Sequence, residues 1–568
     1  MKKVISVLLA LLLVASMLSV AAFAESGSDL KIAVASDLHY CRTPEAIEGP
    51  SVGSIDDPIY WYANRRAAME TESGFIIDEF LKQCADSDCD YVLISGDLAD
   101  SGRRYPEEHY DVAEKLRKFE AETGKDVFVI DGNHDLGEDT MTDVDDFKKI
   151  YADFGYDKAL ETLDGTCSYT ANLGEKYRLI ALDSCDPTAS TADGMNAERV
   201  DWVITQAKLA KNDGRYPILM MHHNLLDHMP LQRVFSKNFI VKFHYSTAEL
   251  FADAGIKIVI SGHEHCSDAT SYTSGLGNTI YDFATTSLTM YPTAYRVFEF
   301  SDSEISYTAK TIESIDTAAL TGAVSGYSDE QIALMNAGLN SYAKGFLKAG
   351  VQYRLERSLS MEKLGVSEDA PYYELVKNAV DTLLLLLNKP LYGEGSVSEI
   401  ASGYNIEIPS TPYKTGWDLA TDLVAAHYAG EEPFSPDRPE VTAFLRTAAV
   451  ILRELMPKVG AEVYYDAANA LLAADGTSDL SSAIVSDFSG ADGITPAEYF
   501  IYSLASPIIY GFAYDDDGVN DNNGVLSGYG ESENNELSNG LDGTLGEILK
   551  KLQYIVHYLL RIFDVILK

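Results

Sequence analysis

The chain has 568 residues, too many for a single core, and its hydrophobic content of 46% and charged content of 23% are those of an ordinary globular protein. Its 87 acidic residues outnumber its 44 basic residues and give a formal net charge of -43. Because this charge repels polyanions, the composition argues against nucleic acid or an anionic bilayer as a general partner.

Residues 1–24 have the pattern of a secretory signal peptide. Lys2 and Lys3 supply the positive start, residues 4–20 are apolar and uncharged, and Ala22-Phe23-Ala24 is a small-x-small cleavage sequence. We therefore expect cleavage after Ala24 and a secreted or cell-surface protein. An uncleaved anchor is the alternative, since the apolar run approaches the ~20 residues that span a bilayer.

Residues 29–314 alternate short apolar runs with amphipathic segments, which predicts an α/β domain with a largely parallel core sheet. The predicted strands are 31–35, 91–95, 127–130, 178–182, 217–221, 256–261, 281–284, 295–300 and 305–310. The predicted helices between them are 73–84, 110–123 and 196–211. In such a domain, ligands bind at the carboxyl ends of the strands.

Residues 328–512 have helical periodicity and contain one histidine, His427, which predicts a separate, mainly α-helical C-terminal domain. The predicted helices are 329–349, 372–388, 417–428, 439–456 and 461–473. Proline and glycine separate these helices, as expected of short connections.

Residues 515–543 are rich in Asp, Asn, Gly, Ser and Glu, a composition that predicts a flexible acidic linker. The run Asp515-Asp516-Asp517-Gly518 resembles part of a calcium loop. It lacks EF-hand spacing and a glutamate at the twelfth position, so the sequence favours a solvated linker. Residues 544–568 predict an amphipathic, locally basic helix. Docking on the helical domain and weak contact with a membrane surface or a partner helix are both open.

Five motifs rich in metal-binding side chains follow the predicted strands. They are, in chain order, Asp37-Leu38-His39, Gly96-Asp97-Leu98-Ala99-Asp100, Gly132-Asn133-His134-Asp135, His222-His223 and Gly262-His263-Glu264-His265. Asp, Asn and His hold hard or borderline divalent metals. A turn after a strand can aim Asp37 and His39 at one ion, and Asp97 suits a bridge between two ions. Two such ions, ~3.5–4 Å apart, grip a phosphate oxygen and lower the pKa of a bridging water.

The ordered set of motifs resembles the calcineurin-like metallophosphoesterase family over residues 30–310. The resemblance implies a four-layer α/β/β/α sandwich with two mixed sheets, and two metal ions drawn from manganese, iron and zinc. It assigns one ion to Asp37, His39, Asp97 and His265, and the other to Asp97, Asn133, His222 and His263. It also makes His134 the group that binds the substrate phosphate or protonates the leaving oxygen, with Asp100 orienting His134. The sequence favours His222 over His223 as the ligand without excluding His223.

We therefore expect an exported metal-dependent phosphohydrolase that cleaves phosphomonoesters or phosphodiesters by attack of a metal-bridging hydroxide. One alternative is a phosphodiesterase for lipid headgroups or cell-wall polymers, which the basic tail would help. Another is a non-catalytic surface binding protein with a vestigial metal site, against which the complete ligand set argues. Ser101 stands where the serine/threonine phosphatase branch continues with arginine, so protein phosphatase activity is not expected.

Overall fold

The structure is a computed structural model, and the part of the chain that it describes holds both sheets and most of the helical region. The described residues are 29–42, 67–138, 140–188, 193–229, 232, 238–370, 373–435, 438–459, 514–515 and 517–531. The predicted signal peptide, the predicted helix 461–473 and the predicted tail helix 544–568 lie outside them. Among the described helices, none has the length and apolar character that crossing a membrane requires.

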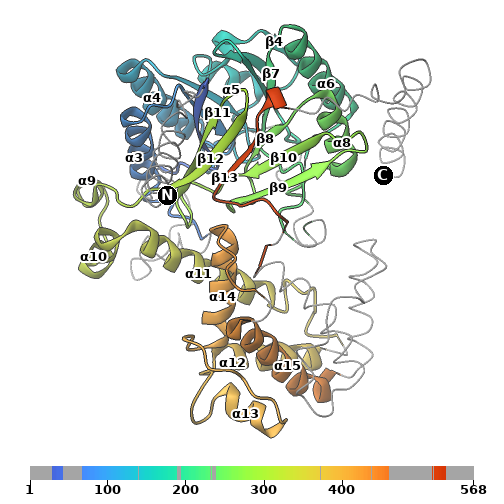
Figure 1. The fold of residues 1–568 in the computed structure, drawn as a ribbon. Coiled ribbons are helices and arrows are strands. Elements are labelled where there is room, and N and C mark those ends of the chain that lie inside the picture. The colour runs from blue at the N-terminus through green and yellow to red at the C-terminus, as the bar shows by residue number, and fades with distance from the viewer. Residues whose placement is uncertain are drawn as a thin grey trace, which may run out of the picture.

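The first of two mixed sheets has six strands and carries the earliest motifs (Figure 1). Its order is β13 (Asn523–Ser527), β12 (Glu304–Thr311), β11 (Ala294–Phe300), β1 (Leu30–Ala35), β2 (Tyr91–Ser95) and β3 (Asp126–Ile130). Strands β1, β2 and β3 run parallel, and the other neighbours pair antiparallel. The carboxyl ends of β1, β2 and β3 therefore meet at one edge of the sheet.

The second sheet has seven strands and carries the histidine motifs. Its order is β4 (Glu161–Thr162), β5 (Tyr169–Leu173), β6 (Tyr177–Leu182), β7 (Tyr216–Met221), β8 (Ile258–Ser261), β10 (Thr279–Ala284) and β9 (Asp268–Thr273). Strands β6, β7, β8 and β10 run parallel. The Tyr169 hydroxyl donates a hydrogen bond of 2.9 Å to the Val129 carbonyl of β3 and so joins the two sheets.

The side chains of β6 alternate between two cores, which explains the layering. Leu179 and Ala181 belong to the core shared with the first sheet, whereas Ile180 and Leu182 pack with the helices outside. This alternation is the period of two expected of a strand buried on both faces. The outer helices are α3 (Ser73–Asp86) and α4 (Pro106–Thr123) beside the first sheet, and α6 (Ala197–Asn212) and α8 (His244–Ala254) beside the second. The predicted fold class, two mixed sheets flanked by helices together with a mainly helical region, is confirmed.

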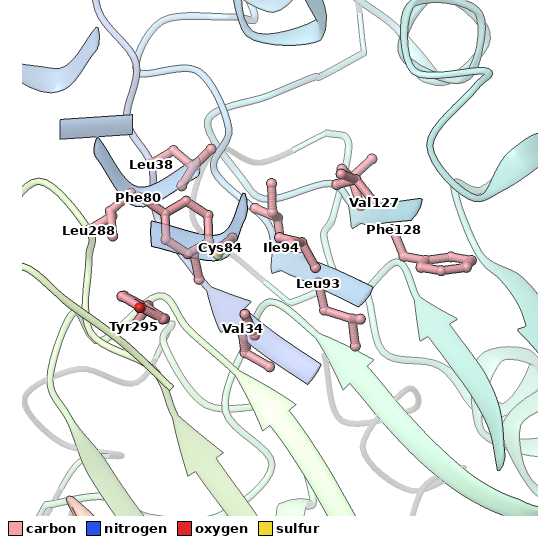
Figure 2. Close-up of a cluster of buried hydrophobic side chains, with 14 of the residues drawn as sticks. Val34, Leu38, Phe80, Cys84, Leu93, Ile94, Val127, Phe128, Leu288 and Tyr295 are labelled. Carbon is pink, nitrogen blue, oxygen red and sulfur yellow. The ribbon is translucent and has the colours of Figure 1, made fainter. Parts of the chain in front are cut away.

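The main core fills the space between the sheets and helices, and Figure 2 shows the part of it around β1 and β2. Val34 and Ile94 are fully buried there, and the Phe80 ring of α3 meets the Tyr295 ring edge-on at a centroid distance of 5.1 Å. Each large apolar side chain buried in this way contributes roughly 1.5–3 kcal/mol to stability. Shorter elements complete this part of the chain: α5 (Val144–Ile150) and the 3₁₀ turns η2 (Tyr156–Lys158) and η4 (Tyr529–Glu531).

The helical region lies to one side of the sheets (Figure 1). Its helices are α9 (Thr317–Ala323), α10 (Asp329–Ala337), α11 (Leu339–Ser358), α12 (Tyr373–Asn388), α13 (Val397–Gly403), α14 (Gly416–Tyr428) and α15 (Pro439–Val459). The prediction of one helix over 329–349 is wrong, because Gly338 has a φ of 158° that no α-helix accommodates. Its N–H instead closes the end of α10 on the Leu334 carbonyl at 3.2 Å.

A buried carboxylate, Glu72, joins the helical region to α3. The hydroxyls of Tyr327 and Tyr342 donate hydrogen bonds of 2.7 and 3.0 Å to the same oxygen of Glu72. Burial raises the pKa of Glu72 despite these two donors. Burial thus favours the neutral acid, whereas the two hydroxyl donors favour the carboxylate.

The prediction of a flexible linker over 515–543 is wrong for the portion that the structure describes. Asn523–Ser527 forms β13 and pairs with β12 through five residues, from Thr308↔Asn523 to Glu304↔Ser527. The buried Tyr529 ring stacks on Tyr216 at 4.8 Å. The polar composition misleads because an edge strand pairs through its backbone and leaves one face in water. The helical region thus lies between two neighbouring strands of one sheet rather than after a complete domain.

Candidate metal centre

The predicted ligands all follow strand ends and therefore gather where both sheets present their carboxyl edges. Asp37 and His39 follow β1, Asp97 follows β2 and Asn133 follows β3. The histidines of the second sheet come after β7 and β8: His222, His263 and His265. The structure thus brings together all seven side chains that the sequence predicts as ligands.

Left-handed backbone turns aim these side chains. Five predicted ligands have positive φ angles: 48° at Asp37, 40° at His39, 49° at Asp97, 68° at His263 and 64° at His265. Residues other than glycine seldom adopt this region, and each such residue costs of the order of 1–3 kcal/mol. Strain of this kind persists only where the surrounding fold enforces it, so the loops are held in a ligand-presenting shape.

The motif glycines allow the loops to approach one another. A Cβ atom on Gly96 would lie 2.6 Å from Nδ1 of His222, and one on Gly132 would lie 2.2 Å from Oδ1 of Asp97. A Cβ atom on Gly262 would lie 2.5 Å from Oδ2 of Asp37. A side chain at any of these positions would displace a predicted ligand, which is the physical reason for glycine in these motifs.

The first group of ligand atoms comprises donors from Asp37, His39, Asp97 and His265, all within 4.8 Å of one another. Nε2 of His265 lies 3.2 Å from Oδ1 of Asp37 and 3.1 Å from Nε2 of His39. Nε2 of His39 lies 3.7 Å from Oδ2 of Asp97. Two nitrogens and two oxygens thus point at one small volume.

The second group comprises donors from Asp97, His222 and His263. Nε2 of His222 lies 3.3 Å from Oδ2 of Asp97 and 3.1 Å from Oδ1 of Asn133. The same Asp97 oxygen therefore faces both groups, as a carboxylate that bridges two cations must.

Each of the two aspartates has one oxygen held by the protein and one left for the centre. Oδ2 of Asp37 accepts the His263 N–H at 2.9 Å, and Oδ1 of Asp97 accepts the His134 N–H at 2.8 Å. The opposite oxygens, Oδ1 of Asp37 and Oδ2 of Asp97, are buried without a hydrogen-bond partner among the described residues, and so is Nε2 of His263.

The electrostatics of the centre favour ionised carboxylates. Burial favours the protonated acid, but the His222 and His134 rings hold the pKa of Asp97 well below its usual value. Burial likewise disfavours a charged His222, yet Asp97 and Asp37 raise its pKa to about 10. Burial and the neighbouring His223 and His222 lower the pKa of His263, which keeps that ring neutral and able to bind a metal.

The geometry separates the adjacent histidines His222 and His223. Nδ1 of His222 donates to the Ser95 carbonyl at 2.9 Å, which leaves Nε2 facing Asn133 and Asp97. Nδ1 of His223 instead meets the Ser184 hydroxyl at 3.0 Å. The structure therefore puts His222 among the candidate ligands, the choice that the sequence favours.

The expected contact between the Asp100 carboxylate and His134 takes another form. The backbone carbonyl of Asp100, at 2.6 Å, accepts the hydrogen bond from Nδ1 of His134. The Asp100 carboxylate lies 3.4 Å from Nδ1 of His39 instead. A backbone group thus orients His134, and the carboxylate acts on a candidate ligand. His134 is half-buried and its ring meets that of His39 edge-on at 4.8 Å.

Three supporting residues have no role in the sequence prediction. Asp135 accepts the N–H groups of Ala99 at 3.0 Å and Gly132 at 2.8 Å, which fixes the second and third motifs together. The Ser36 hydroxyl lies 2.5 Å from Oδ2 of Asp37, and the Phe239 ring stacks on His263 at 4.1 Å. The only sequence signal for these roles is position beside a motif, for Asp135 and Ser36.

Comparison with known proteins identifies the family. A dimetal phosphatase from Danio rerio is similar at 11% identity with a TM-score of 0.36, over 50% of this chain and 96% of that chain. No curated protein matches the chain. The model of the calcineurin-like phosphoesterase family matches residues 30–267, which hold all five motifs. Residues 30–267 therefore form a calcineurin-like phosphoesterase domain, and this match supports a hydrolase of phosphoric ester bonds.

Proposed function

We propose that this domain binds two metal ions and hydrolyses a phosphomonoester or a phosphodiester. One observation carries the proposal: Oδ2 of Asp97 faces both groups of ligand atoms and has no hydrogen-bond partner among the described residues. Asp37, His39 and His265 would hold the first ion with Asp97. Asn133, His222 and His263 would hold the second.

The donor set fits transition metals. Oδ1 of Asp37, Oδ2 of Asp97 and Nε2 of His263 are buried atoms without hydrogen bonds among the described residues, and each costs about 1–3 kcal/mol unless it is paired. Ligation would remove that cost. Mixed imidazole and carboxylate donors suit manganese, iron or zinc, whereas magnesium and calcium prefer oxygen ligands alone. When bound, such a pair of ions supplies Lewis-acid activation of water and of the phosphoryl oxygens.

His134 is the group of this chain that we assign to the substrate. Because the Asp100 carbonyl can only accept, Nδ1 of His134 carries a proton, and Nε2 is the atom left to meet the substrate. The side chain is partly exposed beside the buried ligands, as a group that meets a substrate must be. Nε2 would hold the proton that passes to the leaving oxygen, or would donate a hydrogen bond to the phosphate.

Turnover of chromogenic phosphomonoesters and phosphodiesters, after chelation and after adding back manganese, tests the function. Asp97→Ala should lose metal and at least ~10³-fold in rate, because a two-metal clamp stabilises charge developing in the transition state. Asp145→Ala, an exposed aspartate on α5, is the matched control and should change neither. No turnover by a chain loaded with both metals would favour a vestigial binding site instead.

His134→Ala separates the proton donor from the ligands. We expect both metals to remain and turnover to fall ~10²–10⁴-fold, the scale of a positioned acid or base. The loss should shrink for substrates with good leaving groups, which need no proton. If metal content falls together with activity, His134 is a ligand and its assigned role is wrong.

We further propose that the chain acts outside the cytoplasm. The support is the pattern of residues 1–24, a charged start, an apolar stretch and Ala22-Phe23-Ala24. Recovery from the medium of a chain that begins at Glu25 would bear this out, and retention of residue 1 would contradict it. For residues 544–568, the net charge of -43 allows at best weak, salt-sensitive membrane contact, which liposome co-sedimentation measures.

A further inference from the structure

A second polar pocket lies away from the candidate metal centre, where three parts of the chain meet. Its volume is about 250 Å³, and five carboxylates line it: Asp227, Asp268, Glu432, Asp515 and Asp517. We call these five residues the seam cluster. Asp227 and Asp268 belong to the phosphoesterase domain, Glu432 to the loop after α14, and the other two to the segment before β13.

Close backbone contacts hold the three parts together beside the seam cluster. The Ser267 N–H donates to the Tyr428 carbonyl at 3.0 Å. The Asn522 side-chain amide donates to the carbonyls of Ala429 at 2.8 Å and Gly430 at 2.9 Å. A Cβ atom on Gly430, whose φ is 59°, would lie 2.1 Å from the Ser267 carbonyl oxygen. The pocket is therefore built by tertiary packing.

Glu432 points to a ligand in this pocket. The residue is 5% exposed and lines the pocket, and its Oε1 pairs with Nδ1 of His427 at 2.5 Å. Its Oε2 is buried and has no hydrogen-bond partner among the described residues. A buried carboxylate oxygen left in this state costs several kcal/mol unless a cation or a proton neutralises it.

The described residues that line the pocket carry more acidic than basic side chains. No lysine or arginine is among the described residues that line the pocket. His228 lines it, but its two ring nitrogens already face Asp268 at 2.5 Å and Asp282 at 3.2 Å. The His427 ring faces Glu432, and the His244 ring faces Asp227 at 3.0 Å, so three imidazole rings stand beside the five carboxylates. Consistent with this excess, burial and then Asp268, Asp515 and Asp517 raise the pKa of Glu432 to about 10.

We propose that the seam cluster is a second metal site, which takes one calcium ion. The oxygen donors that line it are carboxylates and the hydroxyl of Thr270, the hard ligands that calcium prefers, and the engaged nitrogens of His228 disfavour zinc. The pocket has room for the waters that complete a shell of 6–8 oxygens. This site also gives Asp515 and Asp517 a role in cation binding without an EF-hand.

Bound calcium would tie the three parts of the chain together. Asp268 begins β9 and follows His265 by three residues, so the ion would also restrain the loop of the candidate metal centre. Its effect should appear first in stability. For a dissociation constant of ~10⁻⁴–10⁻³ M, typical of extracellular calcium sites, 10 mM calcium should raise the melting temperature by about 3–10 °C.

Equilibrium dialysis with radioactive calcium tests the site on the full chain. Asp97→Asn, which disables the candidate metal centre, should still bind one calcium ion per chain. In that background, Glu432→Gln should weaken binding at least ~10-fold, because it removes the buried charge at nearly constant shape. Glu431→Gln removes the same charge from the exposed neighbouring side chain and should change the affinity less than about twofold.

Asp517→Asn is the second variant, because Asp517 is exposed and its substitution leaves the packed seam intact. It too should weaken calcium binding and reduce the calcium-dependent rise in melting temperature. The proposal is overturned if Asp97→Asn binds no calcium up to 10 mM, which would mean that protons neutralise the seam cluster. It is equally overturned if Glu432→Gln and Asp517→Asn bind calcium as tightly as Glu431→Gln.

Discussion

Gly132→Ala tests whether close packing of the loops is what places the shared ligand. The added Cβ atom would lie 2.2 Å from Oδ1 and 2.3 Å from the backbone nitrogen of Asp97. Cβ contacts below 3.0 Å essentially do not occur, so the two loops must separate by about 1 Å. Rotation of the Asp97 side chain cannot relieve the clash between the added Cβ atom and the Asp97 backbone nitrogen. The displacement therefore reaches the ligand that both groups share.

Two magnitudes follow from a shift of this size. Overpacking of this kind costs about 1–3 kcal/mol of stability. A misplacement of about 1 Å in a catalytic group costs roughly 10²-fold in rate. Because Asp97 faces both ligand groups, we expect kcat/KM to fall ~10²–10³-fold and the metal content to fall below two per chain.

The assay combines phosphoester turnover, metal content by mass spectrometry and the melting temperature. Gly345→Ala in α11 is the control, because a Cβ atom there meets nothing within 4 Å. It should leave turnover unchanged and stabilise the helix by roughly 0.5–1 kcal/mol. A Gly132→Ala chain with two metals and activity within threefold of the parent would refute the steric argument.

Three further predictions concern other contacts. Asp100→Asn should weaken metal binding, because the Asp100 carboxylate faces His39. It should leave the dependence of rate on the leaving group unchanged, because the backbone carbonyl of Asp100 orients His134, and a changed dependence would contradict this. The pKa of Glu72 is raised from 4.5, so stability from the neutral acid is lost as pH rises above that value. Calorimetry should therefore show that the melting temperature of Glu72→Gln, relative to the parent, increases from pH 4.5 upward, and a pH-independent difference would contradict this. A chain that ends after residue 513 lacks β13, whereas a chain that ends after residue 543 retains it, so the shorter chain should melt several degrees lower. Equal melting temperatures would mean that β13 adds no stability.

The candidate ligands are predictable from the sequence because each motif is local. A strand such as Tyr91–Ser95 is an apolar run of ordinary length, and the Gly96-Asp97 pair marks its end. The order of the motifs then supplies the family, and with it the pairing of distant loops. Strand positions and candidate ligands are therefore predictable from a few residues at a time.

Features that depend on backbone contacts are not predictable in this way. Asn523–Ser527 has the composition of a loop, and only the open edge of β12 makes it a strand. Similarly, the sequence suggests that the Asp100 carboxylate orients His134, whereas the carbonyl of the same residue accepts the hydrogen bond. Side-chain type does not reveal which atom of a residue a fold will use.

The position of β13 has a consequence for how the protein is made. The first sheet reaches its final edge only after residue 527 has been synthesised, with the helical region between β12 and β13. At ordinary translation rates, the roughly 200 residues between these strands take about 10–40 s to add. During that interval β12 is an unprotected edge open to pairing with other chains. A nascent chain stalled in the helical region would therefore carry complete ligand motifs on an unfinished sheet, and would be most prone to aggregate at that stage.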